Sequence, residues 1–303
     1  MASPQVIALF GPTGVGKTAV AIALAQRLRA HGETPVAVSC DALQVYDGLQ
    51  ILTGAADSQE RAQLEHRLIS FLPIDAQFSA GQYAELAHRE IDAIIAAGQR
   101  PIIVGGTGLY LRAALAALSL KPPPGEGVRE RWLTELAAQG PESLHALLAQ
   151  RAPEAAAAIA PTDSQRIVRA LELDEAGELA TPQEQSELWT EATRHPTLLV
   201  GLVMDREQLY GQIDARVDQM LAAGVEAEVR RADGAGASVT ARKALGFEEL
   251  LSGDVEAMKR HTRNYARRQL TWMRKLRGAR VLDISELTPE EAAQAIFEAW
   301  LAA

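Results

Sequence analysis

A glycine-rich stretch that ends in lysine and threonine lies near the start of the chain. Residues 11–18 read Gly-Pro-Thr-Gly-Val-Gly-Lys-Thr, the spacing G-x-x-x-x-G-K-[ST], between an apolar run and a helical pattern. In such a turn, successive backbone N–H groups point at one anion, and the positive end of the following helix adds to the attraction. The Lys17 ammonium can reach a second phosphate, and the Thr18 hydroxyl can bind Mg²⁺. The pattern predicts a polyphosphate site without identifying ATP, and an unoccupied glycine-rich turn is the alternative.

Two further turns follow apolar runs that read as buried strands. Asp41 comes just after residues 35–39, and Gly105-Gly106-Thr107-Gly108 follows residues 100–104. Because the carboxyl ends of parallel strands meet at one edge of a sheet, we expect Asp41 close to the phosphate turn. A carboxylate there can bind Mg²⁺ or act as a base, and its alternative role is that of a helix N-cap.

The charge of the chain is unevenly distributed. The whole chain has 30 Lys and Arg against 39 Asp and Glu, a net charge of −9, yet nine of the cations and no acid lie within residues 259–280. A helix there would bury one face, formed by Tyr265, Gln269, Trp272 and Leu276. The arginines, Arg267 and Arg268 among them, fall on other faces and could meet a polyanion such as RNA or DNA. A solvated basic helix is the alternative.

An arginine adjoins the apolar stripe of another predicted helix. In residues 207–223 that stripe is Ile213, Val217 and Met220, and Arg216 lies beside it. An arginine next to buried side chains usually has an anionic partner. That partner is either a carboxylate of this chain or a bound phosphate.

The apolar runs also predict the scaffold that positions these residues. Continuous apolar runs indicate buried strands at residues 5–10, 35–39, 100–104, 197–204 and 280–284. Helical patterns alternate with them, and two or three helices are expected between the last two strands. The alternation predicts an α/β fold, a P-loop NTPase-like parallel sheet flanked by helices.

The composition changes in the middle of the chain. Residues 121–125 read Lys-Pro-Pro-Pro-Gly, a stiff linker, and residues 128–191 are rich in Ala, Leu, Glu and Gln with helical spacing. We therefore expect an all-helical subdomain at residues 121–194. It would be inserted into an α/β core formed by residues 1–120 and 195–303.

The overall composition is that of an ordinary globular protein. The 303 residues are 48% hydrophobic and 23% charged, which excludes disorder, collagen and coiled coil as whole-chain interpretations. Cys40 is the one cysteine, so no internal disulfide forms, and without an adjacent base it reads as a small buried residue. Neither a signal peptide nor a membrane-length apolar run is recognised. We expect a cytoplasmic monomer with no membrane partner.

Eight segments, spread over nearly the whole chain, together resemble the tRNA dimethylallyltransferases, also called tRNA isopentenyltransferases. They are GPTGVGKT at 11–18, SCDALQVYDGL at 39–49, SAGQY at 79–83, PIIVGGTGLYLRAAL at 101–115, DSQRIVRALEL at 163–173, DARVDQMLAAG at 214–224, ALGFEEL at 244–250 and YARRQLTWMRK at 265–275. A P-loop alone would be unspecific, whereas its combination with the Asp41 turn, the GGTGLYLRA turn and the RRQLTWMRK helix is specific.

The resemblance implies transfer of a dimethylallyl group from its diphosphate to N6 of the adenine beside the tRNA anticodon, position 37, with release of diphosphate. The phosphate turn would hold the leaving diphosphate rather than ATP. Lys17, the turn amides, Mg²⁺ and Arg216 would stabilise the departing negative charge. Asp41 matches the family's base, which removes the N6 proton as the C–N bond forms. The adenine must leave its stack, so base flipping is implied.

By match to the family's motifs, several sets of residues carry this chemistry. The catalytic set is Asp41, Thr107 and Arg216, and Thr18 is the Mg²⁺ ligand. The diphosphate-binding set is Gly11, Thr13, Gly14, Val15, Gly16, Lys17 and Thr18. The tRNA-binding set is Asp41, Ala42, Leu43, Gln44, Thr107, Arg129, Gln165, Arg166, Ile167, Val168, Arg169, Lys243, Gly246, Phe247, Arg267 and Arg268. The helical subdomain would grip the anticodon arm of the tRNA.

The chain departs from the family pattern at three places. Ala42 replaces the usual serine, residues 51–57 lack the family's lysine, and residues 160–163 read Ala-Pro-Thr-Asp in place of His-Pro-Asn-Asp. Two other functions share the main motifs. One is a P-loop small-molecule kinase, which would bind ATP and release ADP. The other is a non-catalytic RNA-binding P-loop protein.

Overall fold

The computed structural model describes residues 4–121, 123–179 and 188–303. Contacts divide the chain into two compact units, one of residues 1–117 and 191–303 and the other of residues 118–190. We call them the α/β unit and the helical unit and describe each by itself. The boundaries expected from composition lie three or four residues further along the chain.

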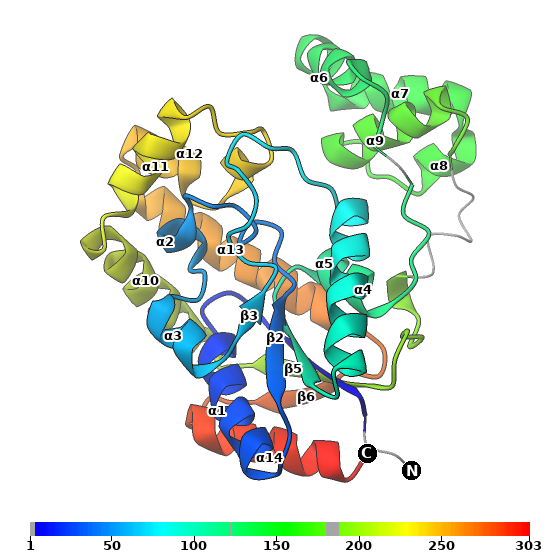
Figure 1. The fold of residues 1–303 in the computed structure, drawn as a ribbon. Coiled ribbons are helices and arrows are strands. Elements are labelled where there is room, and N and C mark those ends of the chain that lie inside the picture. Colours follow the sequence, from blue (N-terminus) through cyan, green and yellow to red (C-terminus); the bar gives the residue numbers. More distant parts are fainter. Residues whose placement is uncertain (1–3, 122, 180–187) are drawn as a thin grey trace. The chain divides into compact units, whose positions relative to one another are not determined.

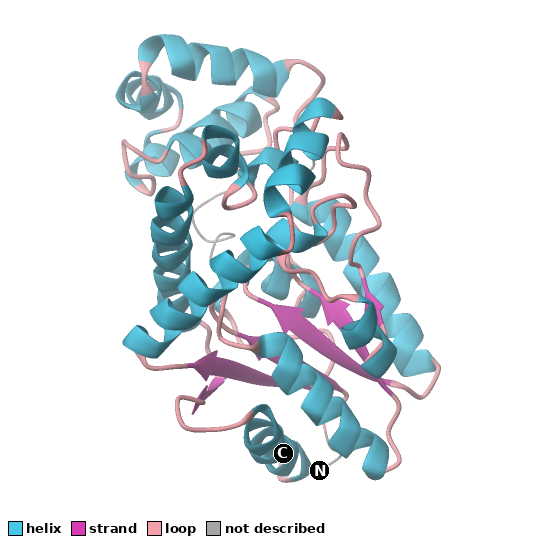
Figure 2. Ribbon diagram, turned by 90° about the vertical axis from the view of Figure 1, so that its left-hand side faces the viewer, coloured by secondary structure: helices cyan, strands magenta, loops and turns pink. Residues whose placement is uncertain are grey.

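The α/β unit is built on a parallel sheet, whose described residues form six strands in the order β3-β2-β4-β1-β5-β6. The strands are β1 (Val6–Phe10), β2 (Pro35–Ser39), β3 (His66–Arg67), β4 (Arg100–Gly105), β5 (Thr197–Val203) and β6 (Arg280–Asp283). All neighbouring pairs run parallel, and the central β1 pairs with β4 and β5. Figures 1 and 2 show this sheet among the helices that flank it. The predicted fold class is confirmed.

Helices cover both faces of this sheet. On one face α1 (Lys17–Ala30) packs against α14 (Pro289–Leu301), and on the other α4 (Ala80–Ala96) packs against α5 (Gly108–Leu115) (Figure 1). The remaining helices of the unit are α2 (Gln50–Thr53), α3 (Ser58–Gln63), α10 (Arg206–Ala222), α11 (Val225–Gly234), η2 (Ala241–Lys243, a 3-10 helix), α12 (Phe247–Ser252) and α13 (Val255–Met273).

Two parts of the α/β unit differ from the expectation. Between β5 and β6 the described chain has four α-helices and η2, where the sequence predicts two or three helices. Gly224 (φ 88°) and Gly246 (φ 96°) begin α11 and α12 in a left-handed conformation that few other residues adopt, so they divide the run. The edge strand β3 is unpredicted because two residues are too short for a pattern.

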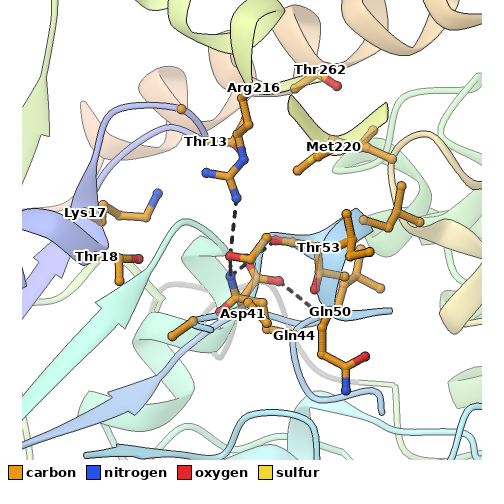
Figure 3. Close-up of a pocket in the computed structure, with 18 of the residues that line it drawn as sticks. Thr13, Lys17, Thr18, Asp41, Gln44, Gln50, Thr53, Arg216, Met220 and Thr262 are labelled. Atoms are coloured by element: carbon orange, nitrogen blue, oxygen red, sulfur yellow. Dashed lines mark hydrogen bonds between the residues drawn. The ribbon is translucent and has the colours of Figure 1, made fainter. Parts of the chain in front are cut away.

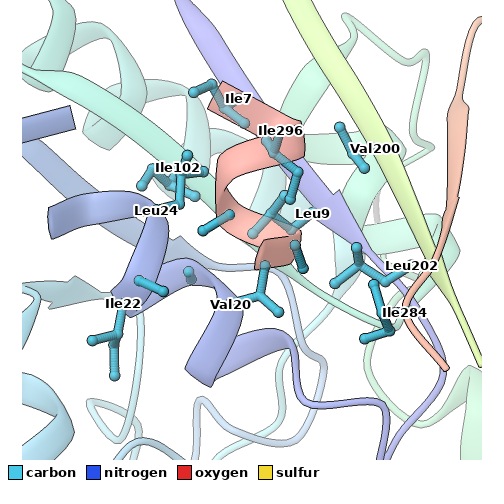
Figure 4. Close-up of a cluster of buried hydrophobic side chains, with 14 of the residues drawn as sticks. Ile7, Leu9, Val20, Ile22, Leu24, Ile102, Val200, Leu202, Ile284 and Ile296 are labelled. Carbon is cyan, nitrogen blue, oxygen red and sulfur yellow. The ribbon is translucent and has the colours of Figure 1, made fainter. Parts of the chain in front are cut away.

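The main core lies between the sheet and the pair α1 and α14. Ile7 and Leu9 of β1, Leu24 of α1 and Ile296 of α14 are almost completely buried there (Figure 4). All five residues of β1 are apolar because helices cover the strand on both sides. The packed core fixes the carboxyl end of β1, where the phosphate turn begins.

A second apolar cluster joins the loop after β2 to α11 and α12. Tyr46 and Leu52 pack there with Phe247. The carboxylate of Glu228 on α11 is buried and accepts hydrogen bonds from the N–H groups of Ile51 (2.9 Å) and Leu52 (2.8 Å) at the start of α2. Burial raises the pKa of Glu228, and these two donors oppose that effect. The cluster therefore fixes α2 against α11.

The described part of the helical unit consists of helices and contains no strand. They are α6 (Val128–Gln139), α7 (Pro141–Arg151), α8 (Pro153–Ala157) and α9 (Ser164–Glu175). Trp132 and Leu148 belong to its apolar core, and the buried carboxylate of Glu172 pairs with Arg129 and Arg169. Residues 180–187 of the predicted helical region lie outside the described residues. In the described chain, no helix combines the length and apolar character needed to cross a membrane.

Candidate active site

Three turns meet at the carboxyl edge of the sheet because β1, β4 and β2 are neighbours there. They are residues 11–16, 105–108 and 40–44. Their backbones lie so close that glycine is required: a Cβ added at Gly105 would overlap the carbonyl oxygen of Cys40, and one at Gly106 would lie 2.8 Å from that of Gly11. The turns converge at one edge, as the strand pattern predicts.

A cavity of about 1150 Å³ opens beside these turns. Its wall includes the phosphate turn, the end of α2, and parts of α10 and α13. Figure 3 shows Lys17 and Thr18 on one side of the cavity, Arg216 reaching in from α10, and Asp41 close by. Lys17, Arg216 and Asp41 therefore face one space, whose wall also carries other charged residues.

Glycines shape the phosphate turn. Gly14 (φ 83°) and Gly16 (φ 89°) are left-handed, and Gly16 begins α1 without a capping side chain. The Val15 side chain is buried in the core, and the Thr13 N–H donates to Oε1 of Gln269 at 2.8 Å. The diphosphate-binding set stays a prediction, and the structure adds two details to it. The Val15 side chain packs in the core and the Thr13 N–H is already paired with Gln269, while other atoms of Thr13 line the cavity.

Lys17 is held by neutral oxygen atoms. Its Nζ donates hydrogen bonds to the carbonyl oxygens of Gly11 and Pro12, each at 2.9 Å. Burial lowers the pKa of Lys17 to about 8, the negative charge of Asp41 raises it, and the positive charge of Arg216 lowers it. An anion in the cavity would stabilise the protonated amine.

Arg216 is half-buried on α10 and is also held by a neutral group. Its Nη2 donates to the carbonyl oxygen of Gly54 at 3.3 Å, and a Cβ added at Gly54 would overlap the guanidinium. In the described part of the chain, Arg216 has no ion pair with a carboxylate. Burial lowers its pKa, while the charges of Asp41 and Glu60 raise it. The structure thus favours a bound anion over a carboxylate of this chain as its partner.

Asp41 closes the turn after β2. Its Oδ1 accepts a hydrogen bond from the N–H of Leu43 at 2.9 Å, and turns rather than a helix follow, so the alternative of a helix N-cap is wrong. Gln44 connects this turn to the end of α2, because its Nε2 donates to Gly54 O (3.2 Å) and its Oε1 accepts from Ser39 Oγ (3.1 Å). The same carbonyl of Gly54 therefore holds both the Asp41 turn and the guanidinium described above.

The turn after β4 contacts α13. Oγ1 of Thr107 lies 3.4 Å from the hydroxyl oxygen of Tyr265. Burial raises the pKa of Tyr265 to about 12, and the charge of Asp41 acts in the same direction. The Tyr265 hydroxyl is therefore protonated at neutral pH.

Cys40 is fully buried and burial raises its pKa, which confirms it as a neutral apolar residue.

Gln269 belongs to the site but was not among the site residues predicted from the sequence. Gln269 lies on α13, lines the cavity and is 4% exposed, and its Nε2 donates to the carbonyl oxygen of Gly106 at 2.8 Å. The sequence does place this glutamine between Tyr265 and Trp272 on the helix face predicted to be buried, which is unusual for a polar side chain. A buried amide needs hydrogen-bond partners, but the sequence does not say which groups they are.

Known proteins share this arrangement of turns and helices. The family model described as IPP transferase matches residues 44–276. Two relatives named tRNA dimethylallyltransferase, from Kineococcus radiotolerans and Thermobifida fusca, are each 40% identical to this chain. They cover 91% and 89% of it, and 90% and 87% of their own length. The chain belongs to the IPP transferase family.

Solved structures of similar proteins agree with this assignment. The full-length tRNA isopentenylpyrophosphate transferase of Bacillus halodurans aligns with a TM-score of 0.69 and 30% identity, over 99% of this chain and 95% of that one. A eukaryotic dimethylallyltransferase acting on tRNA aligns with a TM-score of 0.75 and 25% identity, over 97% of this chain and 77% of that one. The resemblance stated for the sequence is confirmed.

Some family-implied tRNA contacts of the α/β unit lie at its surface. Arg267 and Arg268 are exposed on α13, and neither has a carboxylate partner in the described chain. Arg267 donates to Oδ1 of Asn264 at 2.7 Å, and the Arg268 guanidinium lies 5.5 Å from the centroid of the Tyr265 ring. Three other implied tRNA contacts, Leu43, Gln44 and Lys243, line the cavity. Ala42 is half-buried and is not part of the cavity wall.

Other members of the tRNA-binding set, which stays a prediction, have no exposed side chain. The side chains of Phe247, Ile167 and Val168 are 0 to 4% exposed, because they fill the apolar clusters of their units. Gly246 has a φ of 96°, which favours glycine, and a Cβ there would overlap Met258. Its role is therefore to allow this backbone conformation. At these positions the backbone is the part that remains for a contact with RNA.

In the helical unit, the implied tRNA contacts fall into two groups. Gln165 and Arg166 are exposed on α9. Arg129 and Arg169 instead donate to the buried carboxylate of Glu172, at 2.7 Å and 3.0 Å. Arg129 joins α6 to α9, Arg169 lies on α9 itself, and together they keep a buried charge paired.

Proposed function

We propose that this protein transfers the dimethylallyl group of dimethylallyl diphosphate to N6 of the adenine beside a tRNA anticodon and releases diphosphate. The observation that carries the proposal is that Lys17, Arg216 and Asp41 face one cavity. The cations suit a leaving diphosphate, and the carboxylate suits the proton of an amine. The names of the relatives and the eukaryotic enzyme acting on tRNA support the same substrates.

We assign the leaving group to the phosphate turn and α10. As the allylic C–O bond breaks, its electron pair leaves with the diphosphate oxygen and positive charge grows on the carbon. Lys17, Arg216 and the uncapped amides at the start of α1 are already in place to stabilise that oxygen charge. A bound diphosphate would replace the neutral carbonyls as the partner of Lys17.

We assign the acceptor adenine to the side of Asp41. The N6 lone pair forms the new C–N bond, and the N6 proton moves to the Asp41 carboxylate as nitrogen becomes positive. Because Oδ1 already accepts from Leu43, Oδ2 is the oxygen assigned to the proton. The hydroxyls of Thr107 and Tyr265 would position the base, which must be flipped out of its stack.

The residues present fit Mg²⁺. The Thr18 hydroxyl and the Asp41 carboxylate are hard oxygen donors that line the same cavity. Among the described residues, no group of three His, Cys, Asp or Glu side chains could hold a metal ion by itself. Such a site suits Mg²⁺ bound mainly by substrate phosphates and water, with Thr18 as the protein ligand. When bound, the ion would neutralise part of the diphosphate charge.

The transfer is tested with labelled dimethylallyl diphosphate and unmodified tRNA in the absence of nucleoside triphosphate. We expect label in the wild-type tRNA, and Asp41→Asn should slow transfer by about 10²- to 10⁴-fold, because amide nitrogen and oxygen accept protons poorly. The affinity for tRNA should stay the same. Asp47→Asn, an exposed carboxylate on the same loop, is the matched control and should keep the wild-type rate.

Each alternative gives a different result. A small-molecule kinase would consume ATP and release ADP with a small acceptor, and would leave the tRNA unlabelled. A non-catalytic RNA-binding protein would bind tRNA without any turnover. If Asp41→Asn transferred at the wild-type rate, the proton acceptor would have to be another group.

A further inference from the structure

One buried glutamine connects two of the three turns at the active edge. Oε1 of Gln269 accepts from the N–H of Thr13 in the phosphate turn, and Nε2 donates to the carbonyl oxygen of Gly106, both at 2.8 Å. The residue is 4% exposed, so water does not compete for these bonds. Thr13 follows β1 and Gly106 follows β4, so Gln269 links the turns after two different strands.

The rest of α13 supports this position. One turn of helix earlier, Tyr265 contacts Thr107, and three residues later Trp272 fills the space where a Cβ of Gly108 would lie. A Cβ at Gly106 would likewise overlap Nε2 of Gln269. Three successive residues of the β4 turn therefore meet three positions on one face of α13, which holds that turn in a single register.

The two turns have different assignments in the proposed reaction. The phosphate turn holds the leaving diphosphate, and the β4 turn carries Thr107 beside the acceptor base. The distance between the reacting carbon and N6 consequently depends on the distance between these turns. A displacement of about 1 Å at a reacting centre can reduce a rate by about 100-fold.

We propose that Gln269 is a positioning residue that fixes the distance between the diphosphate site and the acceptor site. The inference rests on the proposed function. Gln269 holds the two substrates at reacting distance through the backbones of Thr13 and Gly106 and does not bind either of them strongly. Its loss should therefore reduce the rate of the chemical step more than the affinity for either substrate.

Gln269→Met tests this proposal, because methionine has nearly the same length and makes neither hydrogen bond. Single-turnover transfer should be about 10- to 100-fold slower, while the KM for dimethylallyl diphosphate, the affinity for inorganic diphosphate and the affinity for tRNA should each change by less than about threefold. Gln208→Met, at an exposed position on α10, is the control for loss of an amide and should keep the wild-type rate. All assays are run well below the unfolding temperature of each variant, measured in parallel.

Gln269→Glu supplies a second readout and serves if the methionine variant does not fold. At neutral pH the carboxylate cannot donate to Gly106 O, but a protonated carboxyl group can donate there and still accept from Thr13 N–H. The activity of this variant relative to wild type should therefore rise as the pH falls.

Two results would overturn the inference while wild type remains active. One is a wild-type single-turnover rate in Gln269→Met, and the other is a loss that appears only in substrate affinity. A relative rate of Gln269→Glu that does not change with pH would also count against it. Failure of the proposed function is distinct, because the wild-type protein itself would then leave the tRNA unlabelled.

Discussion

The cations of the cavity and those of the helical unit are held by different kinds of partner. In the cavity, Lys17 and Arg216 donate to neutral backbone carbonyls. In the helical unit, every described arginine pairs with a carboxylate: Arg129 and Arg169 with Glu172, Arg131 with Glu175, Arg151 with Asp174, and Arg166 with Asp163. A carbonyl dipole carries no net charge and cancels less of the positive charge than a carboxylate in direct contact does.

This difference separates two uses of positive charge. The carboxylate of Glu172 is completely buried, so its two arginines prevent an unpaired charge in the core of the helical unit. Lys17 and Arg216 line a cavity together with Asp41, but among the described residues neither has a carboxylate within ion-pair distance, so both remain available to a bound anion. We therefore expect substitution of a cation held by carbonyl groups to affect ligand binding and catalysis most. Substitution of a cation paired with a carboxylate should affect them least.

The largest effect is expected for Lys17→Ala. Removal of a preorganised charge from the leaving group should lower kcat/KM for dimethylallyl diphosphate by about 10²- to 10³-fold, whereas the affinity for tRNA should change little. Steady-state kinetics and a tRNA-binding titration measure the two quantities. Arg29→Ala, an exposed cation at the other end of α1, is the control and should keep the wild-type kinetics. A collapse of tRNA binding in Lys17→Ala would contradict the assignment of this lysine to the diphosphate.

The pH dependence should show a smaller effect of the same lysine. Because burial lowers its pKa to about 8, Lys17 loses its proton as the pH rises through that value. The protonated amine attracts diphosphate, so kcat/KM for dimethylallyl diphosphate should fall about tenfold per pH unit above pH 8. Bound diphosphate raises this pKa, so the fall in kcat should begin at a higher pH.

Lys17→Arg is the control for this profile. An arginine stays protonated over the whole range, so the decrease above pH 8 should disappear even if the rate at pH 7 is lower. The same decrease in the variant would assign the titration to a different group. The carboxylate-paired arginines of the helical unit cannot produce it, because they too stay protonated.

The strands and the phosphate turn could be predicted because their causes are local. A strand covered on both faces must be apolar at every position, and the prediction for residues 35–39 agrees with β2 at both ends. The phosphate turn could be recognised because Gly14 and Gly16 have positive φ values, which favour glycine, and these glycines form part of the motif. Parallel strands then bring their carboxyl ends to one edge, so Asp41 could be placed beside Lys17 without a structure.

Contacts across the chain could not be predicted in the same way. Helical spacing put Gln269 on a buried face, but its partner Thr13 lies 256 residues away. A family motif also does not separate exposed from buried residues. The motif at residues 163–173 contains both the exposed Arg166 and the buried Ile167. Their positions follow from the apolar period of α9, where Ile167 and Leu171 form one buried stripe. The apolar period of the sequence could therefore have distinguished the exposed residues of this motif from the buried ones.

The smallest effects are expected at the surface, where Arg267 and Arg166 form a matched pair. Both are exposed arginines of the implied tRNA-binding set, but Arg267 donates to the neutral Asn264 and Arg166 lies 3.6 Å from the carboxylate of Asp163. Arg267→Ala should weaken tRNA binding by about three- to tenfold and reduce the slope of log affinity against log salt by about 1. Arg166→Ala should change the affinity by less than about twofold, because Asp163 already offsets part of its attraction for phosphate.

Titrations of tRNA at several salt concentrations distinguish these outcomes, because a lost phosphate contact changes the salt dependence and a lost packing contact does not. Asp163→Asn sharpens the test, since it leaves Arg166 with a neutral neighbour like that of Arg267. In that background Arg166→Ala should cost more affinity than it does in the wild-type protein. Equal losses for Arg267→Ala and Arg166→Ala, unaffected by Asp163→Asn, would show that the partner of an arginine does not decide its contribution to RNA binding, and the comparison would fail at the surface.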